Sequence, residues 1–211
     1  MIKGLQERLH LTKFVSDEAL TAVEKADLKG LALGGERKEA TVLFSDIRGF
    51  TSMSEKMEPE EVVNLLNTYY DKKTEIIQNF GGDIDKFVGD EVMAIFKGDQ
   101  MANQAVDCAV EIQAEIQRLN RELGKNIEIG IGINSGSMVM GAMGSKDRMD
   151  FTVIGDNVNL ASRLCSVAKA GEVIISENTE KLLVDTNSRT IKLDPIHVKG
   201  KEKPIQIYRV E

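Results

Sequence analysis

The sequence has few cysteines and no long apolar run. Cys108 and Cys165 are its only cysteines, and both lie in stretches with helical spacing. We therefore expect two reduced core thiols and no disulfide. No apolar stretch approaches the roughly 20 residues of a membrane-spanning helix, and no signal peptide is evident. The sequence thus favours a cytoplasmic domain that makes no membrane contact of its own, whether or not a longer protein carries an anchor.

Basic charge is scarce as well. The 211 residues include 27 Lys and Arg but 34 Asp and Glu, which gives a net charge of −7. This balance argues against a nucleic-acid-binding surface. A site for a strongly anionic ligand in such a chain would need locally placed cations and metal ions. The hydrophobic content of 42% is sufficient for the core of one domain.

The first 36 residues differ from the rest. They are mixed in charge, lack a clean helical period and end near Gly34-Gly35, a pair that could form a hinge. We interpret residues 1–36 as a linker or connector to an upstream sensor region, which would make the chain a fragment of a longer protein. Residues 37–211 are then expected to form the functional domain.

One stretch, TVLFSDIRGFT at residues 41–51, combines a strand with a possible ligand site. The run from Thr41 to Phe44 predicts a buried strand, and Asp46 follows at its end. Gly49 would allow the backbone to come close to a ligand. A carboxylate here can hold a hard cation, while the N–H groups of the following turn can face an anion. Taken alone, such an Asp is more often a cap or turn residue.

A second stretch, at residues 84–96, strengthens this interpretation. Two short apolar strands surround Gly89-Asp90, which predicts a tight hairpin with an acid at its tip. Asp46 and Asp90 could then lie on neighbouring strands and share a site for two metal ions. In such sites the ions lie about 3.5–4 Å apart and clamp the attacking and leaving oxygens of a phosphoryl displacement.

The remaining sequence mixes helices with strands. Helical spacing predicts helices over residues 59–80 and 103–121, with apolar stripes that we assign to core packing and with Lys73 interrupting the first stripe. We expect separate strands over 127–133 and 137–143, a charged loop over 144–150, and a helix beginning near Asp156. Further expected elements are strands over 151–154, 173–175, 190–198 and 204–210 and a short helix over 177–184. This order indicates an α+β fold.

Three motifs together resemble the class III adenylate/guanylate cyclase catalytic domain. They are FSDIRGFT (44–51), KFVGDEVMAIF (86–96) and FTVIGDNVNLASRL (151–164), and the similarity runs from about residue 36 to the C-terminus. The resemblance implies a ferredoxin-like βαββαβ core with extra C-terminal strands and a helix. It also implies two Mg²⁺ or Mn²⁺ ions per site, held by Asp46, Asp90 and the backbone carbonyl of Ile47.

The resemblance assigns the nucleotide phosphates to several residues. The backbone N–H groups of Gly49 and Phe50, with Thr51, would hold the β- and γ-phosphates. Lys199 matches a phosphate-binding lysine near the C-terminus of the family, although Lys201 is close enough to leave that choice open.

Four other residues match the family's ribose, transition-state and base positions. Asn159 would orient the ribose, and Arg163 would stabilise charge on the α-phosphate. The two are four residues apart on a predicted helix, a spacing that otherwise describes an ordinary solvated face. Lys86 and Thr152 would read adenine, by donating to N1 and accepting from N6. Thr152 replaces a commoner Asp, and guanine readers of the family carry Glu and Cys instead.

The activity implied is that of an adenylate cyclase, which converts ATP into 3′,5′-cyclic AMP and pyrophosphate in signal transduction. The family builds its sites between two protomers of a head-to-tail homodimer. One alternative is a guanylate cyclase, which would need a different residue from Lys86, and another is a regulatory module that binds nucleotide without turnover. Gly81-Gly82-Asp83 is similar to a diguanylate cyclase signature, but it ends a predicted helix and does not lie on the hairpin that carries Asp90.

Overall fold

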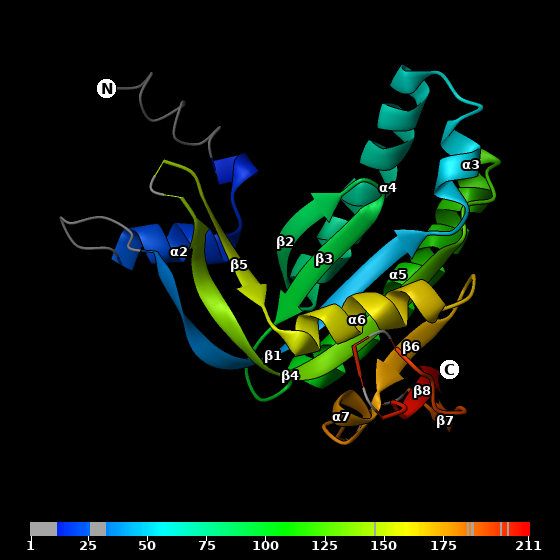
Figure 1. The fold of residues 1–211 in the computed structure, drawn as a ribbon. Coiled ribbons are helices and arrows are strands. Elements are labelled where there is room, and N and C mark those ends of the chain that lie inside the picture. The colour runs from blue at the N-terminus through cyan, green and yellow to red at the C-terminus, as the bar shows by residue number, and fades with distance from the viewer. Residues whose placement is uncertain are drawn as a thin grey trace.

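A computed structural model describes residues 12–25, 33–145, 147–184, 186, 188–198, 200–201 and 203–211, without the side chain of Lys13. Its elements form one sheet with helices on both faces (Figure 1). The helices are η1 (Thr12–Phe14), α2 (Asp17–Lys25), α3 (Phe50–Ser54), α4 (Pro59–Asn79), α5 (Met101–Leu123), α6 (Asp156–Val167) and α7 (Glu177–Glu180). The strands are β1 (Gly34–Ile47), β2 (Asp83–Val88), β3 (Glu91–Phe96), β4 (Ile129–Gly144), β5 (Met149–Ile154), β6 (Val173–Ser176), β7 (Thr190–Lys192) and β8 (Ile207–Val210).

The strand order is β2-β3-β1-β4-β6-β8-β7, and β5 pairs with β4 as a side branch. The pairs β2–β3, β3–β1 and β1–β4 are all antiparallel. Together with α4 and α5 these four strands follow the order βαββαβ of a ferredoxin-like core. The sheet continues beyond β4 with β6 in parallel and β8 and β7 antiparallel. The predicted α+β fold is therefore confirmed.

The long pairing of β1 with β4 corrects two predictions. Its register runs from Gly34 opposite Ala142 to Ile47 opposite Ile129. Gly34 and Gly35 therefore begin a strand, and their assignment as a hinge is wrong. The strand crosses the predicted boundary between residues 36 and 37, and the division into connector and functional domain stays a prediction.

The second correction concerns β4, which is one strand where two were predicted. Residues 134–136 read as Asn-Ser-Gly, a turn-like sequence, yet they pair with Val42, Thr41 and Ala40 of β1. The buried hydroxyls of Thr41 and Ser135 also lie 2.7 Å apart in a hydrogen bond. The ladder and this side-chain bond outweigh the local preference for a turn.

The two long predicted helices, α4 and α5, are present, and both cover one face of the sheet. Pro59 begins α4, where Glu58 and Glu61 form a capping box that satisfies free N–H groups of the first turn. The buried sides of α4 and α5 pack on a cluster that includes Leu43, Ile131 and residues of β3. Of the described helices, none combines the length and the apolar character needed to cross a membrane.

The opposite face is covered by α6, which crosses β4 at Gly132 (Figure 1). A Cβ atom at Gly132 would lie 2.0 Å from the backbone nitrogen of Cys165 and 2.6 Å from the carbonyl oxygen of Ala161. Only glycine allows this approach, so one residue of β4 determines how closely α6 lies on the sheet. Both cysteines are buried and unpaired, as predicted.

The C-terminal elements are shorter than predicted. The helix α7 ends at Glu180, four residues before the predicted end, although the Ser176 hydroxyl caps it by accepting from the N–H of Thr179. The two last strands shrink to β7 and β8, and an isolated bridge between Ile196 and Ile205 joins the segment between them. The expected loop over 144–150 is also shorter, because β5 begins at Met149.

Lys73 is a charged residue that is almost completely buried within the described part of the chain. It lies on the inner side of α4 with 1% exposure, and its Nζ has no hydrogen-bond partner among the described residues. Burial lowers its pKa to about 8, while the nearby charges of Asp46 and Asp90 oppose this change. Lys73, which interrupts the apolar stripe of α4 in the sequence, is thus buried together with the apolar residues of that stripe.

We expect Lys73→Met to raise the free energy of unfolding at pH 7, without divalent metal, by about 1–3 kcal/mol, because the buried ammonium has no partner. The folded-state pKa of about 8 lies below the ordinary 10.5. Wild-type stability should therefore rise relative to the variant between these pH values, since only the unfolded chain then keeps its proton. Urea unfolding at pH 7 and 10 measures both effects, and a destabilised variant at pH 7 would contradict them.

Candidate active site

Asp46 and Asp90 meet where the end of β1 lies beside the β2–β3 turn. The ladder of β1 and β3 runs up to Ser45 opposite Val92, so the next residues of β1 reach the turn. There the N–H of Ile47 donates to Oδ2 of Asp90 over 2.9 Å. Gly89 and Asp90 form the turn itself, and Gly89 has a φ of 62°. The predicted hairpin with an acid at its tip is confirmed.

The two carboxyl groups perturb one another. Burial, a hydrogen bond with Asp90 and the charge of Asp90 together raise the pKa of Asp46 to about 7. Arg48 opposes this rise, because its Nη2 lies 2.8 Å from Oδ2 of Asp46. Arg48 also donates to Sγ of Cys165, while its own Nε is buried and has no hydrogen-bond partner among the described residues. Sequence reasoning missed Arg48, although its place two residues after Asp46 was a signal.

The donor atoms present suit a hard divalent cation. Two carboxylates and a backbone carbonyl at Ile47 are oxygen ligands of the kind that Mg²⁺ and Mn²⁺ prefer. No group of three or more His, Cys, Asp or Glu side chains that could hold a metal occurs in the described part of the chain. Mg²⁺ is usually bound through one or two carboxylates, with waters and substrate phosphates as further ligands. The residues therefore fit a metal that is shared with a phosphate-bearing substrate.

The turn after β1 carries the predicted phosphate-binding groups. Gly49 has a φ of 70°, a left-handed conformation that glycine adopts without strain, and it directly precedes α3. The first N–H groups of α3, including those of Phe50 and Thr51, have no acceptor within the helix. They lie within a few residues of Asp46, so N–H groups that are free to meet an anion adjoin the carboxylate pair.

Tyr70 of α4 supports the hairpin turn, a contact that the sequence did not reveal. Its hydroxyl donates to the carbonyl of Gly89, and its ring lies against Phe87 with centroids 4.4 Å apart. The residue before Asp90 is thus anchored to a helix of the core.

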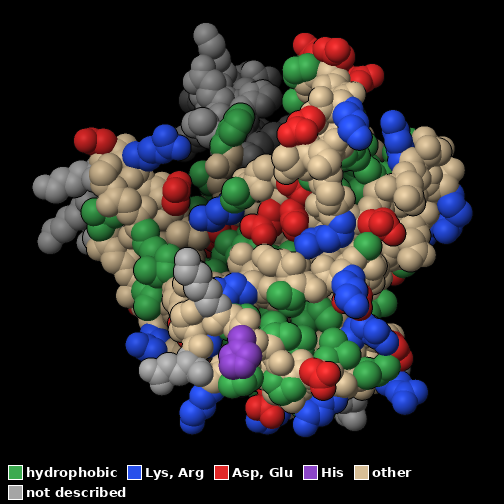
Figure 2. Space-filling view, turned by 45° about the vertical axis from the view of Figure 1, so that its right-hand side comes forward, with side chains coloured by type: hydrophobic (Ala, Val, Ile, Leu, Met, Phe, Trp, Pro, Cys, Tyr) green, Lys and Arg blue, Asp and Glu red, His purple; other side chains and the backbone are tan. Residues whose placement is uncertain are grey.

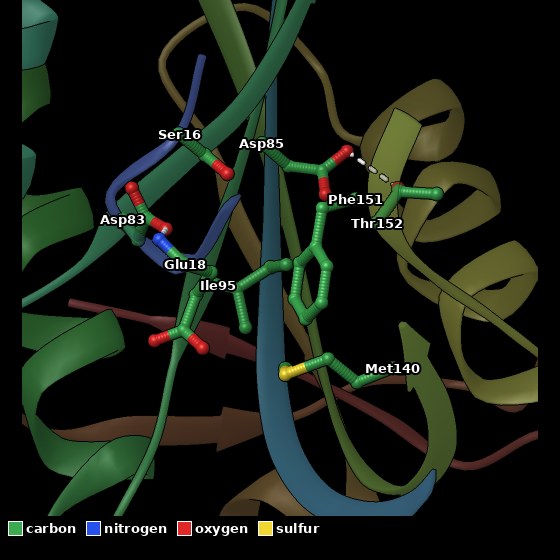
Figure 3. A pocket seen from close by; sticks show the side chains of 8 residues that line it. All are labelled: Ser16, Glu18, Asp83, Asp85, Ile95, Met140, Phe151 and Thr152. Atoms are coloured by element: carbon green, nitrogen blue, oxygen red, sulfur yellow. Dashed lines mark hydrogen bonds between the residues drawn. The ribbon is translucent and has the colours of Figure 1, made fainter. Parts of the chain in front are cut away.

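Thr152 and Asp85 line a small pocket beside β2 (Figure 3), and the predicted partner of Thr152, Lys86, contacts Asp85 there. The hairpin of β4 and β5 brings Thr152 to β2, where its hydroxyl donates to Oδ2 of Asp85 over 2.8 Å. Nζ of Lys86 lies 3.3 Å from the same oxygen. Lys86 and Thr152 were predicted from the sequence as site residues. Asp85, which contacts both of them, was not.

The helix α2 lies next to this pocket. Ser16 and Glu18 contribute to its lining, and the carboxylate of Asp83 accepts from the N–H groups of Asp17 and Glu18 over 3.2 and 3.0 Å. Glu18 also forms an ion pair with Lys97. Part of the predicted connector is therefore packed on the domain.

Asn159 and Arg163 lie on the outer side of α6. Asn159 is exposed, Arg163 is half-buried, and neither side chain forms a hydrogen bond or ion pair with another described residue. The loop near the C-terminus approaches them, since a Cβ atom at Gly200 would lie 3.7 Å from a terminal nitrogen of Arg163. Lys199 lies outside the described residues, and Lys201 is paired with Asp156.

Figure 2 shows acidic side chains gathered near the middle of one face of the molecule, with basic side chains beside them. The described site residues have the same mixed character. The carboxylates of Asp46 and Asp90 lie near the charges of Arg48, in the turn after β1, and of Lys73 on α4. Such a mixture can bind a metal ion and a polyphosphate in one place.

Comparisons with known proteins show to which family the chain is similar. Residues 35–211 match the family model of the adenylate and guanylate cyclase catalytic domain. An adenylate cyclase of Anabaena cylindrica is 36% identical over 94% of this chain and 42% of its own length. A terminal-differentiation-specific adenylate cyclase of Dictyostelium discoideum is also 36% identical, over 95% of this chain and 10% of its own. The chain thus spans less than half of either relative.

Solved structures give the same result for the fold. The adenylyl cyclase CyaB from P. aeruginosa has a TM-score of 0.81 and 41% identity, with 85% of this chain and 96% of that chain covered. The guanylyl cyclase Cya2 has a TM-score of 0.76 and 38% identity, with coverages of 84% and 94%. By the match to the family model over most of its length, the chain belongs to the adenylate and guanylate cyclase catalytic domain family.

Proposed function

We propose that this chain is the catalytic domain of an adenylate cyclase, which converts ATP into 3′,5′-cyclic AMP and pyrophosphate in signal transduction. The observation that carries the proposal is the meeting of Asp46 and Asp90 beside the turn at Gly49. Two hard carboxylates next to free N–H groups suit a metal-bound triphosphate. Two curated relatives are named adenylate cyclases, which supports the same activity.

The proposed metal ligands are the carboxylates of Asp46 and Asp90 with the carbonyl of Ile47. Two Mg²⁺ or Mn²⁺ ions bound there would neutralise triphosphate charge and lower the pKa of the ribose 3′-hydroxyl. A nearby cation favours the ionised carboxylate, so a metal ion would also oppose the effects that raise the pKa of Asp46.

The residues of the chain itself bind and orient the nucleotide in this proposal. The N–H groups of Gly49 and Phe50, together with Thr51, bind the β- and γ-phosphates, and Lys199 adds a cation. On α6, Asn159 orients the ribose. The planar fork of Arg163 donates to oxygens of the α-phosphate, where negative charge grows as the 3′-oxygen attacks in line.

Adenine is read by Lys86, which donates to N1, and by Thr152, which accepts from the 6-amino group. Their proximity across β2 and β5 supports this assignment. Because a guanylyl cyclase is among the similar structures, the base preference needs its own measurement.

We further propose that the active form is a head-to-tail homodimer with sites at the interface. One protomer supplies the metal ligands, and the other supplies the base readers with Asn159 and Arg163. The exposed and unpaired state of Asn159 and the lack of a partner for Arg163 in the described chain suit such a shared site. A related guanylyl cyclase domain from the fungus Blastocladiella emersonii is described as a non-canonical dimer, which supports dimer formation but not the head-to-tail arrangement. A related bacterial adenylyl cyclase is described as light-regulated, which fits an upstream sensor region.

We expect the purified chain to form cyclic AMP from ATP with Mn²⁺, and Asp46→Ala to lose this turnover while keeping the wild-type circular dichroism spectrum. The variant removes one of two carboxylates that hold the metal. Asp71→Ala, at an exposed position of α4, is the matched control and should retain activity. Parallel assays with GTP measure the base preference. Near-native turnover by the variant would exclude the metal assignment, and inactivity of the wild type would favour a regulatory nucleotide-binding module.

Arg163→Ala should lower kcat by roughly 10²–10³, as expected when one preorganised donor to the transition state is lost. The effect on KM should be smaller, because the charge that Arg163 meets develops during the reaction. Steady-state kinetics with ATP separate the two parameters. A change in KM alone would mean that Arg163 only binds the ground state.

Mixing Asp46→Ala with Arg163→Ala should restore activity that neither variant has alone. In a mixed dimer with shared sites, one site carries both lesions and the other carries none. Random re-pairing of equal amounts makes about half the dimers mixed, so roughly a quarter of wild-type activity should return. No recovery, with subunit exchange confirmed independently, would mean that each site lies within one protomer.

A further inference from the structure

The proposed base-reading site around Lys86 and Thr152 contains an acid, Asp85, to which neither the family resemblance nor the proposed mechanism gives a role. The side chain of Asp85 has 0% exposure, and it lies between Lys86 and Thr152. Figure 3 shows one of its oxygens directed at Thr152 across the pocket. Its other oxygen, Oδ1, is buried and has no hydrogen-bond partner among the described residues. A buried carboxylate in this state needs an explanation.

The backbone brings this acid to the pocket by an irregularity in β2. The register with β3 passes from Ile84 opposite Ala94 to Lys86 opposite Met93, so Asp85 has no partner on β3. Such a bulge can redirect side chains, and bulges occur often beside active sites. Asp85 and Lys86 are neighbours in a strand, where side chains normally alternate between faces. Here they contact one another instead.

A threonine hydroxyl alone does not distinguish adenine from guanine. It can accept a hydrogen bond from the 6-amino group of adenine or donate one to the 6-oxygen of guanine. An ionised carboxylate only accepts. Thr152 therefore donates its single hydrogen to Asp85, and only its lone pairs remain for a base.

Lys86 supports this arrangement. Its ammonium has three donors, and the contact with Asp85 at 3.3 Å uses one of them, which leaves others for N1 of adenine. Burial raises the pKa of Asp85, while the hydrogen bond from Thr152 and the charge of Lys86 oppose that rise. The two neighbours thus stabilise the ionised form that acts as a pure acceptor.

We propose that Asp85 is a specificity-determining positioning residue: it fixes the Thr152 hydroxyl as an acceptor, so that the pocket selects a 6-aminopurine and rejects a 6-oxopurine. This rests on the proposed cyclase function and adds the source of its base preference. A guanine 6-oxygen would face the lone pairs of Thr152 with no hydrogen between them. The negative charge of Asp85 behind the hydroxyl would increase that repulsion.

The main test is Asp85→Asn, which keeps the shape of the side chain but allows it to donate to Thr152. The hydroxyl can then turn its hydrogen toward a 6-oxygen. The ratio of kcat/KM for ATP to that for GTP should fall about tenfold to a hundredfold, the size expected for one buried hydrogen bond with a charged group. An unchanged ratio in the folded variant would overturn the proposal.

Three further variants separate positioning from a merely structural role. In a Thr152→Val background, Asp85→Asn should change the ratio of kcat/KM for ATP to that for GTP much less, because Asp85 acts through the hydroxyl. Adding Thr152→Asp to Asp85→Asn should restore the preference for ATP, since a carboxylate at 152 again only accepts. Asp83→Asn is the matched control: it removes an acid from the same pocket that instead binds the N–H groups of Asp17 and Glu18, and should leave the ratio unchanged.

The wild-type chain provides a test that does not depend on a folded variant. Purine riboside triphosphate, which has hydrogen in place of the 6-amino group, should have a kcat/KM about tenfold or more below that of ATP. Equal use of the two nucleotides would mean that no acceptor contacts the 6-amino group, and would overturn the proposal. If the wild type forms no cyclic AMP at all, the proposed function fails. If the wild type forms cyclic AMP but the kcat/KM ratios between nucleotides do not change as expected, only the role of Asp85 fails.

Discussion

The antiparallel pairing of β1 with β4 is the interaction on which the rest of the structure depends. It joins every residue of β1 to β4, from Gly34 opposite Ala142 to Ile47 opposite Ile129. One end of this ladder brings Asp46 to the β2–β3 turn, and the other continues into the β4–β5 hairpin that carries Thr152. A slip of one residue would turn each side chain of β1 to the opposite face and separate Asp46 from its site.

The burial of charged groups away from water is the main cost of this site to the stability of the fold. Asp46 and Asp90 lie close enough to raise the pKa of Asp46, and Lys73 is buried near them with no hydrogen-bond partner in the described chain. Arg48 offsets part of the negative charge through its contact with Asp46. Proteins tolerate local conflicts of this kind mainly at functional sites, with the compensation provided elsewhere. Here α4, which carries Lys73, packs together with α5 on the sheet through an extensive apolar cluster.

Much of the fold could be predicted from local sequence. The start of α4 at Pro59 and the hairpin at Gly89-Asp90 follow from capping and turn chemistry, and both are present. The continuity of β4 through residues 134–136 could not be predicted, because it depends on pairing with a strand more than ninety residues away, as the Thr41–Ser135 separation of 94 shows. The helix α7 was overestimated because only its capped first turn is helical.

The sequence by itself determined which chemical groups are available: an acid at a strand end, an acid in a tight turn, and a Lys and a Thr in motifs that resemble a family. The tertiary structure decided which groups touch. Asp85 bonds Thr152 across 67 residues, and Tyr70 bonds the carbonyl of Gly89 across 19. Neither contact has a periodic or motif signal, because hydrogen bonds between distant segments depend on strand register and on a bulge in β2. Residue type and spacing are local properties, whereas the direction in which a hydroxyl donates is set by the neighbour that the fold supplies.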